Sequence, residues 1–295
     1  MTSPPVFRFA PSPNGELHLG HALSALVGAG MARRLGGRFL VRIEDIDTRR
    51  CRPEYIEHIL EDLAWLGIQW EEPVLRQSEQ LPVYVEAARR LEAAGVLYPC
   101  YATRTEIAAA AFRGKGSVDP DGVPLYPGRD KVLSAAEAAR RMESGAPCAL
   151  RLDMARALDL AAGVLKGRPL TFTEVDLHGN PSQVPAQPAF WGDAVIVRKD
   201  LPASYHLAVV VDDARQGVTH VTRGLDLYPA TGLHRLLQVL LGLPEPVYHH
   251  HRLVTDERGR KLAKSARDTS LKALRSQGWT PQRVREALGL DRIFG

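Results

Sequence analysis

The stretch that decides the fold is Arg8-Phe9-Ala10-Pro11-Ser12-Pro13-Asn14-Gly15-Glu16-Leu17-His18-Leu19-Gly20-His21. The apolar run from Val6 to Ala10 predicts a short buried strand, and the two prolines that follow end it. A loop then leads into a pattern of small and apolar residues over 19–35 that predicts a long helix. Strand, glycine-containing loop and helix in this order are typical of the start of a doubly wound α/β sheet.

The remaining chain alternates between strand and helix signals. Gly36 and Gly37 stop the first helix, and an apolar run then predicts the next strand. On the same grounds we expect strands at 39–43, 193–198, 207–213 and 219–223, and helices at 53–66, 81–94 and 228–241, with two more that begin near 270 and 281.

The segment 98–188 differs in character from the segments around it. Its many glycines and prolines predict a loop-rich insertion, with a helix near 135–144 and strands near 149–152 and 170–175. We therefore predict an α/β fold in which a doubly wound Rossmann-type domain is split by an α+β insertion. The expected limits are 1–97 and 189–245 for the two halves of that domain, 98–188 for the insertion, and 246–295 for a small helical subdomain with a lysine-containing loop.

Composition sets broad limits. Of the 295 residues, 45% are hydrophobic and 24% are charged, as is ordinary for a globular protein. The net charge of +4 permits nucleic-acid binding without requiring it. The N-terminus lacks a signal-peptide pattern, and no apolar run approaches the roughly 18 to 20 residues that span a bilayer, so we expect a cytoplasmic protein. Cys51, Cys100 and Cys148 are too few and too widely spaced for a disulfide framework.

Two histidines mark the junction between the first loop and the first helix. His18 and His21 flank Gly20 at a helix N-terminus, which presents unpaired N–H groups and the positive end of the dipole. The imidazoles could donate hydrogen bonds to an α-phosphate while a carboxylate attacks it and pyrophosphate leaves, and one such donor is typically worth about 2.7–4 kcal/mol. Taken alone, the pair could equally be a helix cap or a surface pair.

A short basic segment near the end of the chain complements the histidines. Gly259 to Ser265 contains Lys261 and Lys264, which could neutralise a triphosphate in a loop that closes over it. In isolation this would be an ordinary solvated basic run. Together with the histidine segment it indicates ATP-driven activation of a carboxylic acid.

The whole chain resembles the glutamyl-tRNA synthetase family of class I synthetases. The motifs that carry the resemblance lie at 8–13, 42–47, 209–213 and 219–227, together with the histidine and lysine segments. The resemblance implies catalytic roles for His18, His21 and Lys264. The ATP contacts that it implies are His18, Gly20, His21, Lys261 and Lys264. Magnesium is expected to accompany the nucleotide without a dedicated set of protein ligands.

The same resemblance implies a pocket for L-glutamate. Its residues would be Arg8, Phe9, Ala10, Pro11, Ser12, Glu44, Tyr205 and Arg223. Glutamate carries two carboxylates and one ammonium group, so two arginines and one carboxylate form the complementary set. Arg8 and Arg223 would hold the carboxylates and Glu44 the ammonium group. Which arginine takes the side-chain carboxylate stays open.

The chain departs from the resemblance at a zinc site. Related proteins bind structural zinc through Cys-x-Cys and a later tyrosine and cysteine. Here Cys100 and Tyr126 remain, but Ala102 replaces the second cysteine and no cysteine follows Tyr126 closely. One thiol and one phenol cannot complete a tetrahedral site, so we expect no zinc and an insertion held by packing alone. The run His249 to His251 is expected to be structural, because adjacent histidines cannot all face one ion.

The acceptor is expected from the same resemblance. Glutamyl-tRNA synthetases normally carry a large C-terminal anticodon-binding region, and we expect none here. The chain therefore resembles truncated paralogues that attach glutamate to the queuosine base in the anticodon loop of tRNA(Asp). The expected partners are L-glutamate, ATP and queuosine-bearing tRNA(Asp), with no membrane and no obligate protein partner. Two alternatives stay open: a minimal enzyme that charges the 3′ end of tRNA(Glu), and a catalytically inactive RNA-binding paralogue.

Overall fold

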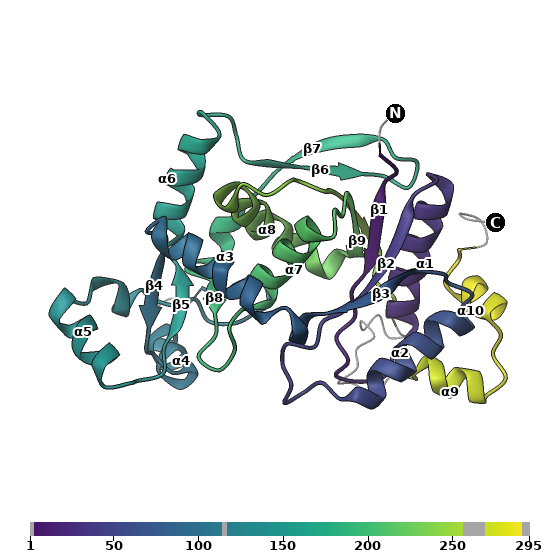
Figure 1. Ribbon diagram of the computed structural model, residues 1–295, viewed down its shortest axis with the longest axis horizontal. Helices are drawn as coiled ribbons and strands as arrows, with labels where there is room; N and C mark the ends of the chain where they lie inside the picture. The colour runs from purple at the N-terminus through teal and green to yellow at the C-terminus, as the bar shows by residue number, and fades with distance from the viewer. Residues whose placement is uncertain (1–2, 114–116, 256–268, 291–295) are drawn as a thin grey trace.

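A large, mostly parallel sheet runs through the molecule (Figure 1). The computed structural model describes residues 3–113, 117–255 and 269–290, and within these ranges seven strands form this sheet. In order across the sheet they are β3 (Glu71–Arg76), β2 (Arg38–Ile43), β1 (Val6–Phe9), β9 (His220–Gly224), β10 (Val247–His251), β6 (Thr171–Val175) and β7 (Pro181–Pro185). All neighbours pair in parallel except β6 and β7.

One face of the sheet is covered by helices from both ends of the chain. Phe7 and Phe9 pack on this face among the apolar residues of four helices. These helices are α1 (Leu19–Arg34), α2 (Pro53–Trp65), α9 (Leu271–Ser276) and α10 (Pro281–Ala287). The first of them approaches β9 closely, since a Cβ at Gly28 would lie 2.8 Å from Thr222 Oγ1.

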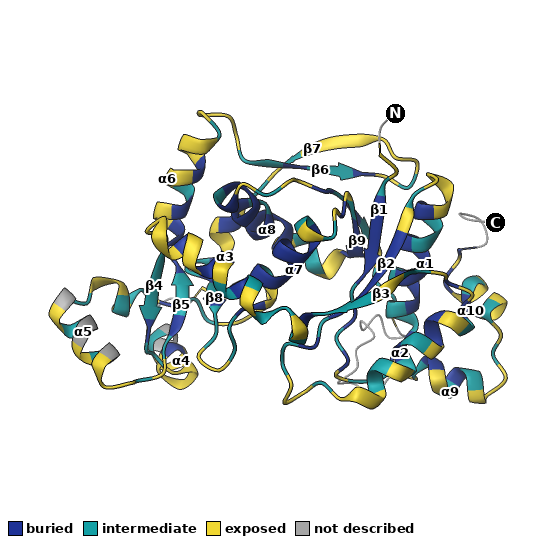
Figure 2. Ribbon diagram, in the orientation of Figure 1, coloured by how far each residue is buried: buried dark blue, intermediate teal, exposed yellow. Residues whose placement is uncertain are grey.

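The opposite face carries charge near its centre. Side chains alternate along a strand, so Arg8 points away from the neighbouring Phe7 and Phe9. It meets Asp213 on α7 (Tyr205–Arg215). A second apolar core lies around this helix and includes α3 (Leu81–Ala93), α6 (Met154–Val164) and α8 (Tyr228–Leu241). Figure 2 shows that α7 and α8 are largely buried, whereas the edge strand β7 is mostly exposed.

A small antiparallel sheet lies apart from the large one. It consists of β4 (Leu97–Cys100), β5 (Ala149–Leu152) and β8 (Val195–Val197), near α4 (Arg104–Arg113) and α5 (Ala135–Glu143). The expectation that 193–198 returns to the large sheet is wrong, because β8 pairs with β5. Conversely, β6 and β7 belong to the large sheet although they fall inside the expected insertion. The domain limits themselves stay a prediction.

The α/β fold class is confirmed, but one expected strand is wrong. Residues 207–213 lie in the helix α7, and every one of them is buried. A helix buried on all sides has no polar stripe, so its apolar run resembles that of a buried strand. Among the described helices, none has the combination of length and apolar character that a membrane crossing needs.

Candidate active site

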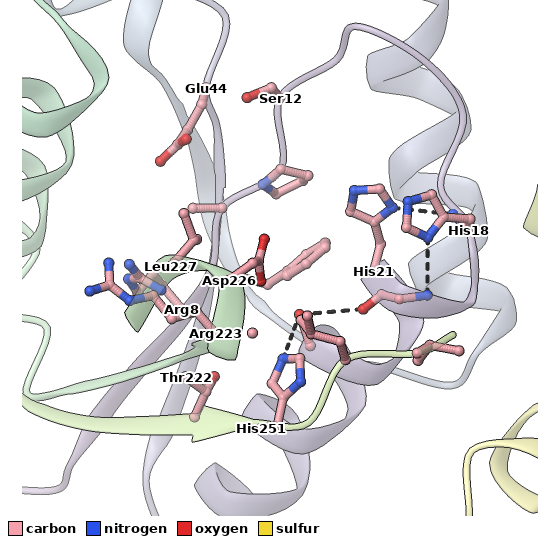
Figure 3. A pocket seen from close by; sticks show the side chains of 18 of the residues that line it. Arg8, Ser12, His18, His21, Glu44, Thr222, Arg223, Asp226, Leu227 and His251 are labelled. Atoms are coloured by element: carbon pink, nitrogen blue, oxygen red, sulfur yellow. Dashed lines mark hydrogen bonds between the residues drawn. The ribbon is translucent and has the colours of Figure 1, made fainter. Parts of the chain in front are cut away.

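A cavity of about 480 Å³ opens where β1, β2, β9 and β10 reach their carboxyl ends (Figure 3). Ligands of open α/β sheets bind at this edge, in the crevice outside the ends of the parallel strands. The cavity brings together every described residue expected for glutamate and ATP: Arg8, Phe9, Ala10, Pro11, Ser12, His18, Gly20, His21, Glu44, Tyr205 and Arg223. Lys261 and Lys264 lie outside the described residues.

The histidine pair caps the first turn of α1. His18 Nδ1 accepts a hydrogen bond from the Gly20 N–H at 3.0 Å, and His21 Nδ1 accepts one from the His18 N–H at 3.2 Å. Each neutral ring must then carry its proton on Nε2, which becomes its donor. The two ring centroids are 3.9 Å apart. Two imidazole donors therefore lie at a helix N-terminus, where negative charge is favoured.

Gly20 allows this arrangement. A Cβ at this position would lie 2.9 Å from Cε1 of His18, closer than side-chain carbons normally approach. Any other residue would displace the His18 ring. The glycine therefore preserves both the cap and the position of the donor.

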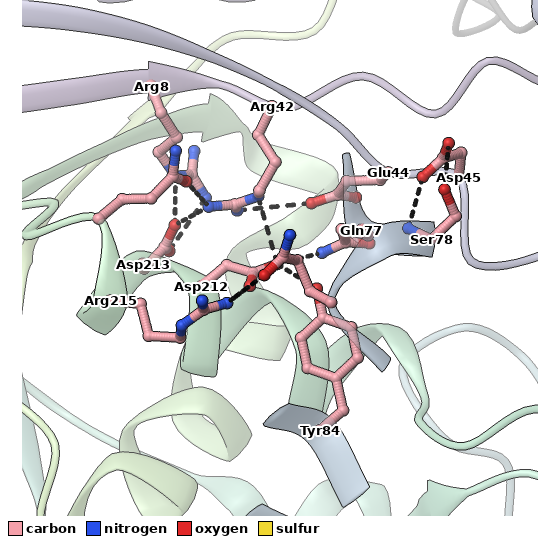
Figure 4. A network of polar contacts seen from close by, with 12 residues as sticks. Arg8, Arg42, Glu44, Asp45, Gln77, Ser78, Tyr84, Asp212, Asp213 and Arg215 are labelled. Atoms are coloured by element: carbon pink, nitrogen blue, oxygen red, sulfur yellow. Dashed lines mark hydrogen bonds and ion pairs between the residues drawn. The ribbon is translucent and has the colours of Figure 1, made fainter. Parts of the chain in front are cut away.

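A buried ion-pair network holds Arg8 beneath the cavity (Figure 4). Its Nε donates to Asp213 at 2.9 Å and its Nη2 donates to the same carboxylate at 3.3 Å. Arg42, which is fully buried, also donates to Asp213 at 2.8 Å and lies 3.8 Å from Asp212. Both arginines are on the α7 face of the sheet because Arg8 is in register with Leu40, two residues before Arg42. The network fixes Arg8, which lines the cavity.

Glu44 lies beside two arginines, yet it resists ionisation. Burial raises the pKa of Glu44 to about 7, although the charges of Arg42 and Arg8 act in the opposite direction. Its carboxylate is 3.5 Å from Nη2 of Arg42. A ligand ammonium group in the cavity would stabilise the ionised form of Glu44 and would itself gain a partner.

Arg223 differs from Arg8 in having neutral partners. It is only 5% exposed, and it donates to Thr231 Oγ1 at 2.6 Å, to His234 Nδ1 at 3.1 Å and to His250 Nε2 at 3.4 Å. Burial and the charge of Arg223 lower the pKa of His250 to about 2 and that of His234 well below its ordinary value. Within the described ranges no carboxylate pairs with Arg223. A buried guanidinium of this kind is incomplete without an anion.

Tyr205 lies at the rim of the cavity. It is the first residue of α7 and is 37% exposed. Its ring is 5.5 Å from those of His206 and His234. The expected role in lining the pocket is compatible with this position.

The histidine run 249–251 makes the structural contacts that were expected, and two of its members also bear on the site. His249 bonds the carbonyl of Val175 at 2.9 Å. His250 supports Arg223, and His251 lines the cavity and bonds Ser24 at 2.7 Å. Strand register explains the link, because His250 is the neighbour of Arg223 across β10 and β9.

Further residues line the cavity that sequence reasoning missed. They come from the loop before α1, from α1 itself, and from the ends of β9 and β10: Asn14, Ser24, Thr222, Gly224, Asp226, Leu227, His251, Arg252, Leu253 and Val254. Asn14 lies in the opening stretch 8–21, and the motif 219–227 contains four more of them. The others are brought in by the fold.

The expected zinc remnant is organised by a carboxylate. Asp130 accepts hydrogen bonds from the N–H groups of Tyr101 and Ala102 at 2.8 and 3.2 Å, and its own N–H donates to the Tyr126 hydroxyl. Within the described ranges, no cluster of three or more His, Cys, Asp or Glu side chains is placed to hold a metal ion. The hydrogen bonds of Asp130 add to the packing of the insertion, so the expectation that packing alone holds it is wrong.

The fold and the cavity define the class of protein. The family described as "tRNA synthetases class I (E and Q), catalytic domain" matches residues 6–293, and the chain belongs to this family. It is a class I aminoacyl-tRNA synthetase-like ligase, from a family that uses ATP.

The chain is similar in particular to Glutamyl-Q tRNA(Asp) synthetase from Rhodobacter capsulatus. The two are 45% identical over 289 residues, which cover 97% of this chain and 100% of that protein. It is also 43% identical to Glutamate--tRNA ligase 2 of Methylobacterium sp., over 95% of this chain and 58% of that protein. A crystal structure of a glutamate tRNA ligase from Elizabethkingia meningosepticum, in complex with its amino acid, matches with a TM-score of 0.70 at 27% identity, over 90% of this chain and 52% of that one.

Proposed function

We propose that the protein activates L-glutamate with ATP and transfers it to the queuosine base of tRNA(Asp). The observation that carries the activation step is the pairing, in one cavity, of a buried arginine that has no carboxylate partner among the described residues with two histidine donors at a helix N-terminus. A dicarboxylic amino acid supplies the anion, and ATP supplies phosphates for the helix end.

In the first step a carboxylate oxygen of glutamate attacks the α-phosphorus of ATP. The new bond makes glutamyl-adenylate, and pyrophosphate leaves. Arg8 and Arg223 bind the two carboxylates, while Glu44 binds the ammonium group. Because the charge of Arg8 is already balanced by Asp213, Arg223 gains more from a ligand carboxylate. Residues 9–12 and Tyr205 shape the pocket around the substrate.

His18 and His21 stabilise the charge that builds on the α-phosphate. Their Nε2–H groups lie beside the N–H groups of the first turn of α1. Lys261 and Lys264 neutralise the triphosphate in the same proposal, and Mg²⁺ accompanies the nucleotide.

In the second step a hydroxyl of queuosine attacks the activated carbonyl and AMP leaves. The choice of acceptor is supported by the 45% identity to a protein named Glutamyl-Q tRNA(Asp) synthetase, whose whole length is matched. A ligase of this kind works where tRNA, ATP and glutamate meet, so the expected cytoplasmic location belongs to the proposal.

The test is ATP-dependent transfer of radiolabelled glutamate to purified tRNA. Label is expected on tRNA(Asp) that carries queuosine and not on tRNA(Asp) that lacks it. Removal of the terminal adenosine should leave the label in place, because the ester lies in the anticodon loop. Equal labelling of both tRNA(Asp) forms would refute the proposed acceptor.

The nearest rival is a minimal glutamate–tRNA ligase, which the 43% identity to Glutamate--tRNA ligase 2 favours. That rival predicts label on tRNA(Glu), lost when the terminal adenosine is removed. An inactive paralogue would show no glutamate-dependent exchange between pyrophosphate and ATP.

A further inference from the structure

Arg223 is held by three side chains that carry no charge. We infer that Thr231, His234 and His250 are positioning residues, which fix the guanidinium of Arg223 without neutralising it and so reserve its charge for a ligand carboxylate. This inference rests on the proposed function for the identity of the ligand. The positions of the side chains do not depend on that proposal.

The first arm of this arrangement runs through two histidines. An arginine N–H can only donate, so His234 Nδ1 must accept the bond from Arg223. His234 therefore carries its proton on Nε2 and donates it to Nδ1 of His206 at 3.1 Å. A protonated His234 would present a second donor to the guanidinium. The hydrogen bond from Arg223 to His234 can therefore form only while His234 is neutral.

The second arm begins at a threonine. Thr231 Oγ1 accepts from Nη2 of Arg223, and its hydroxyl proton is then directed to Nε2 of His250, 3.1 Å away. The opposite ring nitrogen of His250 donates to Glu174 at 2.8 Å. Glu174 is thus reached only through His250 and does not pair with Arg223 directly.

Burial makes the arrangement rigid. Thr231 is fully buried, His234 is 2% exposed, and the side chain of His250 is fully buried. Burial with the charge of Arg223 depresses the pKa of both histidines, which agrees with their neutral state. Arg8 shows the alternative solution on the adjacent strand, where the buried carboxylate of Asp213 holds it and balances its charge. The two arginines of the cavity are therefore held in place by different means.

The positioning role is tested by two variants of similar shape. Thr231→Val removes the acceptor and keeps the branched side chain, whereas Thr231→Ser keeps the hydroxyl. A hydrogen bond to a charged group is worth about 1.5–3 kcal/mol, so Thr231→Val should raise the KM for glutamate in pyrophosphate exchange by about tenfold or more. The KM for ATP should be unchanged, and Thr231→Ser should stay within about threefold of the wild type. Equal KM values for glutamate in the two variants would overturn the role.

The charge is tested at His234. Asn and Asp have the same shape and can each accept from Arg223, but Asp also neutralises it. His234→Asn should keep glutamate affinity within about threefold, because the hydrogen bond to the guanidinium is retained. His234→Asp should lower it by about tenfold or more and shift selectivity towards glutamine, since a charged partner competes for the guanidinium. Equal glutamate affinities in the two variants would contradict the inference that the partners of Arg223 must be uncharged.

Crystal structures separate this inference from the proposed function. The Arg223 guanidinium should move in Thr231→Val and keep its place in Thr231→Ser, with melting temperatures close to that of the wild type. An unmoved Arg223 in Thr231→Val overturns the inference even in a protein that activates glutamate. If the wild type neither binds nor activates glutamate, the proposed function fails, and the position of Arg223 in the two variants still decides the inference.

Discussion

At the scale of single residues, the capping role of His18 and its proposed role as a hydrogen-bond donor to ATP can be separated by mutation. His18 uses Nδ1 to cap α1 and presents Nε2–H as a donor. Asn is among the best N-cap residues, and its side-chain oxygen can replace Nδ1 but not the Nε2–H donor. We predict that His18→Asn leaves stability within about 0.5 kcal/mol of the wild type and lowers kcat by about 100- to 1,000-fold. Urea unfolding and pyrophosphate exchange measure the two effects.

A second variant at the same position serves as the control. His18→Ala loses the cap as well as the donor, so it should fall in kcat by a similar factor and also lose about 1 kcal/mol of stability. A His18→Asn protein with nearly normal kcat would exclude the proposed donor role.

Glu44 predicts a dependence on pH. Its pKa of about 7 means that the carboxylate is ionised above this pH and protonated below it. Only the ionised form attracts the substrate ammonium group, so the KM for glutamate should rise about tenfold for each pH unit below 7 and level off above it. Pyrophosphate exchange between pH 5.5 and 8.5 measures the curve. Glu44→Gln should give a high KM with no such slope, and an unchanged slope in this variant would assign the titration to another group.

The sequence could point to the residues that we propose to bind the ligand, but not to those that hold them in place. Arg8, Glu44 and Arg223 lie in motifs whose types match the charges of glutamate. Thr231 and His234 are on a helix that follows β9, and their contact with Arg223 depends on how that helix packs. Such contacts join positions whose distance no local pattern encodes.

At the scale of elements, strand β2 carries two arginines in contrasting settings. Arg42 is fully buried among Asp212, Asp213 and Glu44, whereas Arg38 is 47% exposed and pairs with Glu71. Removing one partner of a buried network leaves charges without compensation, at a cost of about 3–5 kcal/mol. We predict a loss of this size in the free energy of unfolding for Arg42→Met.

Arg38→Met is the matched control for that variant. An exposed ion pair is worth at most about 1 kcal/mol, so urea unfolding should show a loss no larger than this. Equal losses in the two variants would mean that the network under the cavity is not a source of stability.

Helix α7 shows where pattern reasoning failed. Its apolar run is as continuous as that of a buried strand, and its two aspartates look like the end of such a strand. In the structure both aspartates are buried because Arg42 and Arg8 reach them. The charge partners lie about 170 to 205 residues away in sequence. By contrast, α1 and β2 were predicted almost to the residue, because Gly36 and Gly37 separate them and local periodicity suffices for the rest.

At the scale of the whole molecule, the insertion is expected to be independent of metal. Burial alone would raise the pKa of Asp130, but hydrogen bonds from Tyr126 and from the N–H groups of Tyr101 and Ala102 hold it below its ordinary value. We predict that a chelator leaves the melting temperature unchanged. Asp130→Ala should weaken the insertion by about 2 kcal/mol, because it leaves two N–H groups without their acceptor.

Hydrogen exchange at Tyr101 and Ala102 measures the local effect, and Glu143→Ala, at an exposed acid of α5, is the control. Asp130 stabilises the insertion in its ionised form. This stabilisation should be fully present above the pKa that Asp130 has in the unfolded chain, and it should be lost as the pH falls through the lower pKa of the folded protein. Slow exchange in Asp130→Ala would contradict the anchoring role.

The exchange of strands between the two sheets has a consequence for modularity. The chain visits the small sheet at β4 and β5, returns to the large sheet at β6 and β7, and crosses again to the small sheet at β8 before β9. Neither sheet is therefore formed by one contiguous segment of the chain that could be removed or exchanged as a unit. A deletion of 98–188 would strip β6 and β7 from β10 and leave β8 without its neighbour. The segment 98–188 and the large sheet must therefore be redesigned together, because each supplies strands that the other sheet or segment needs.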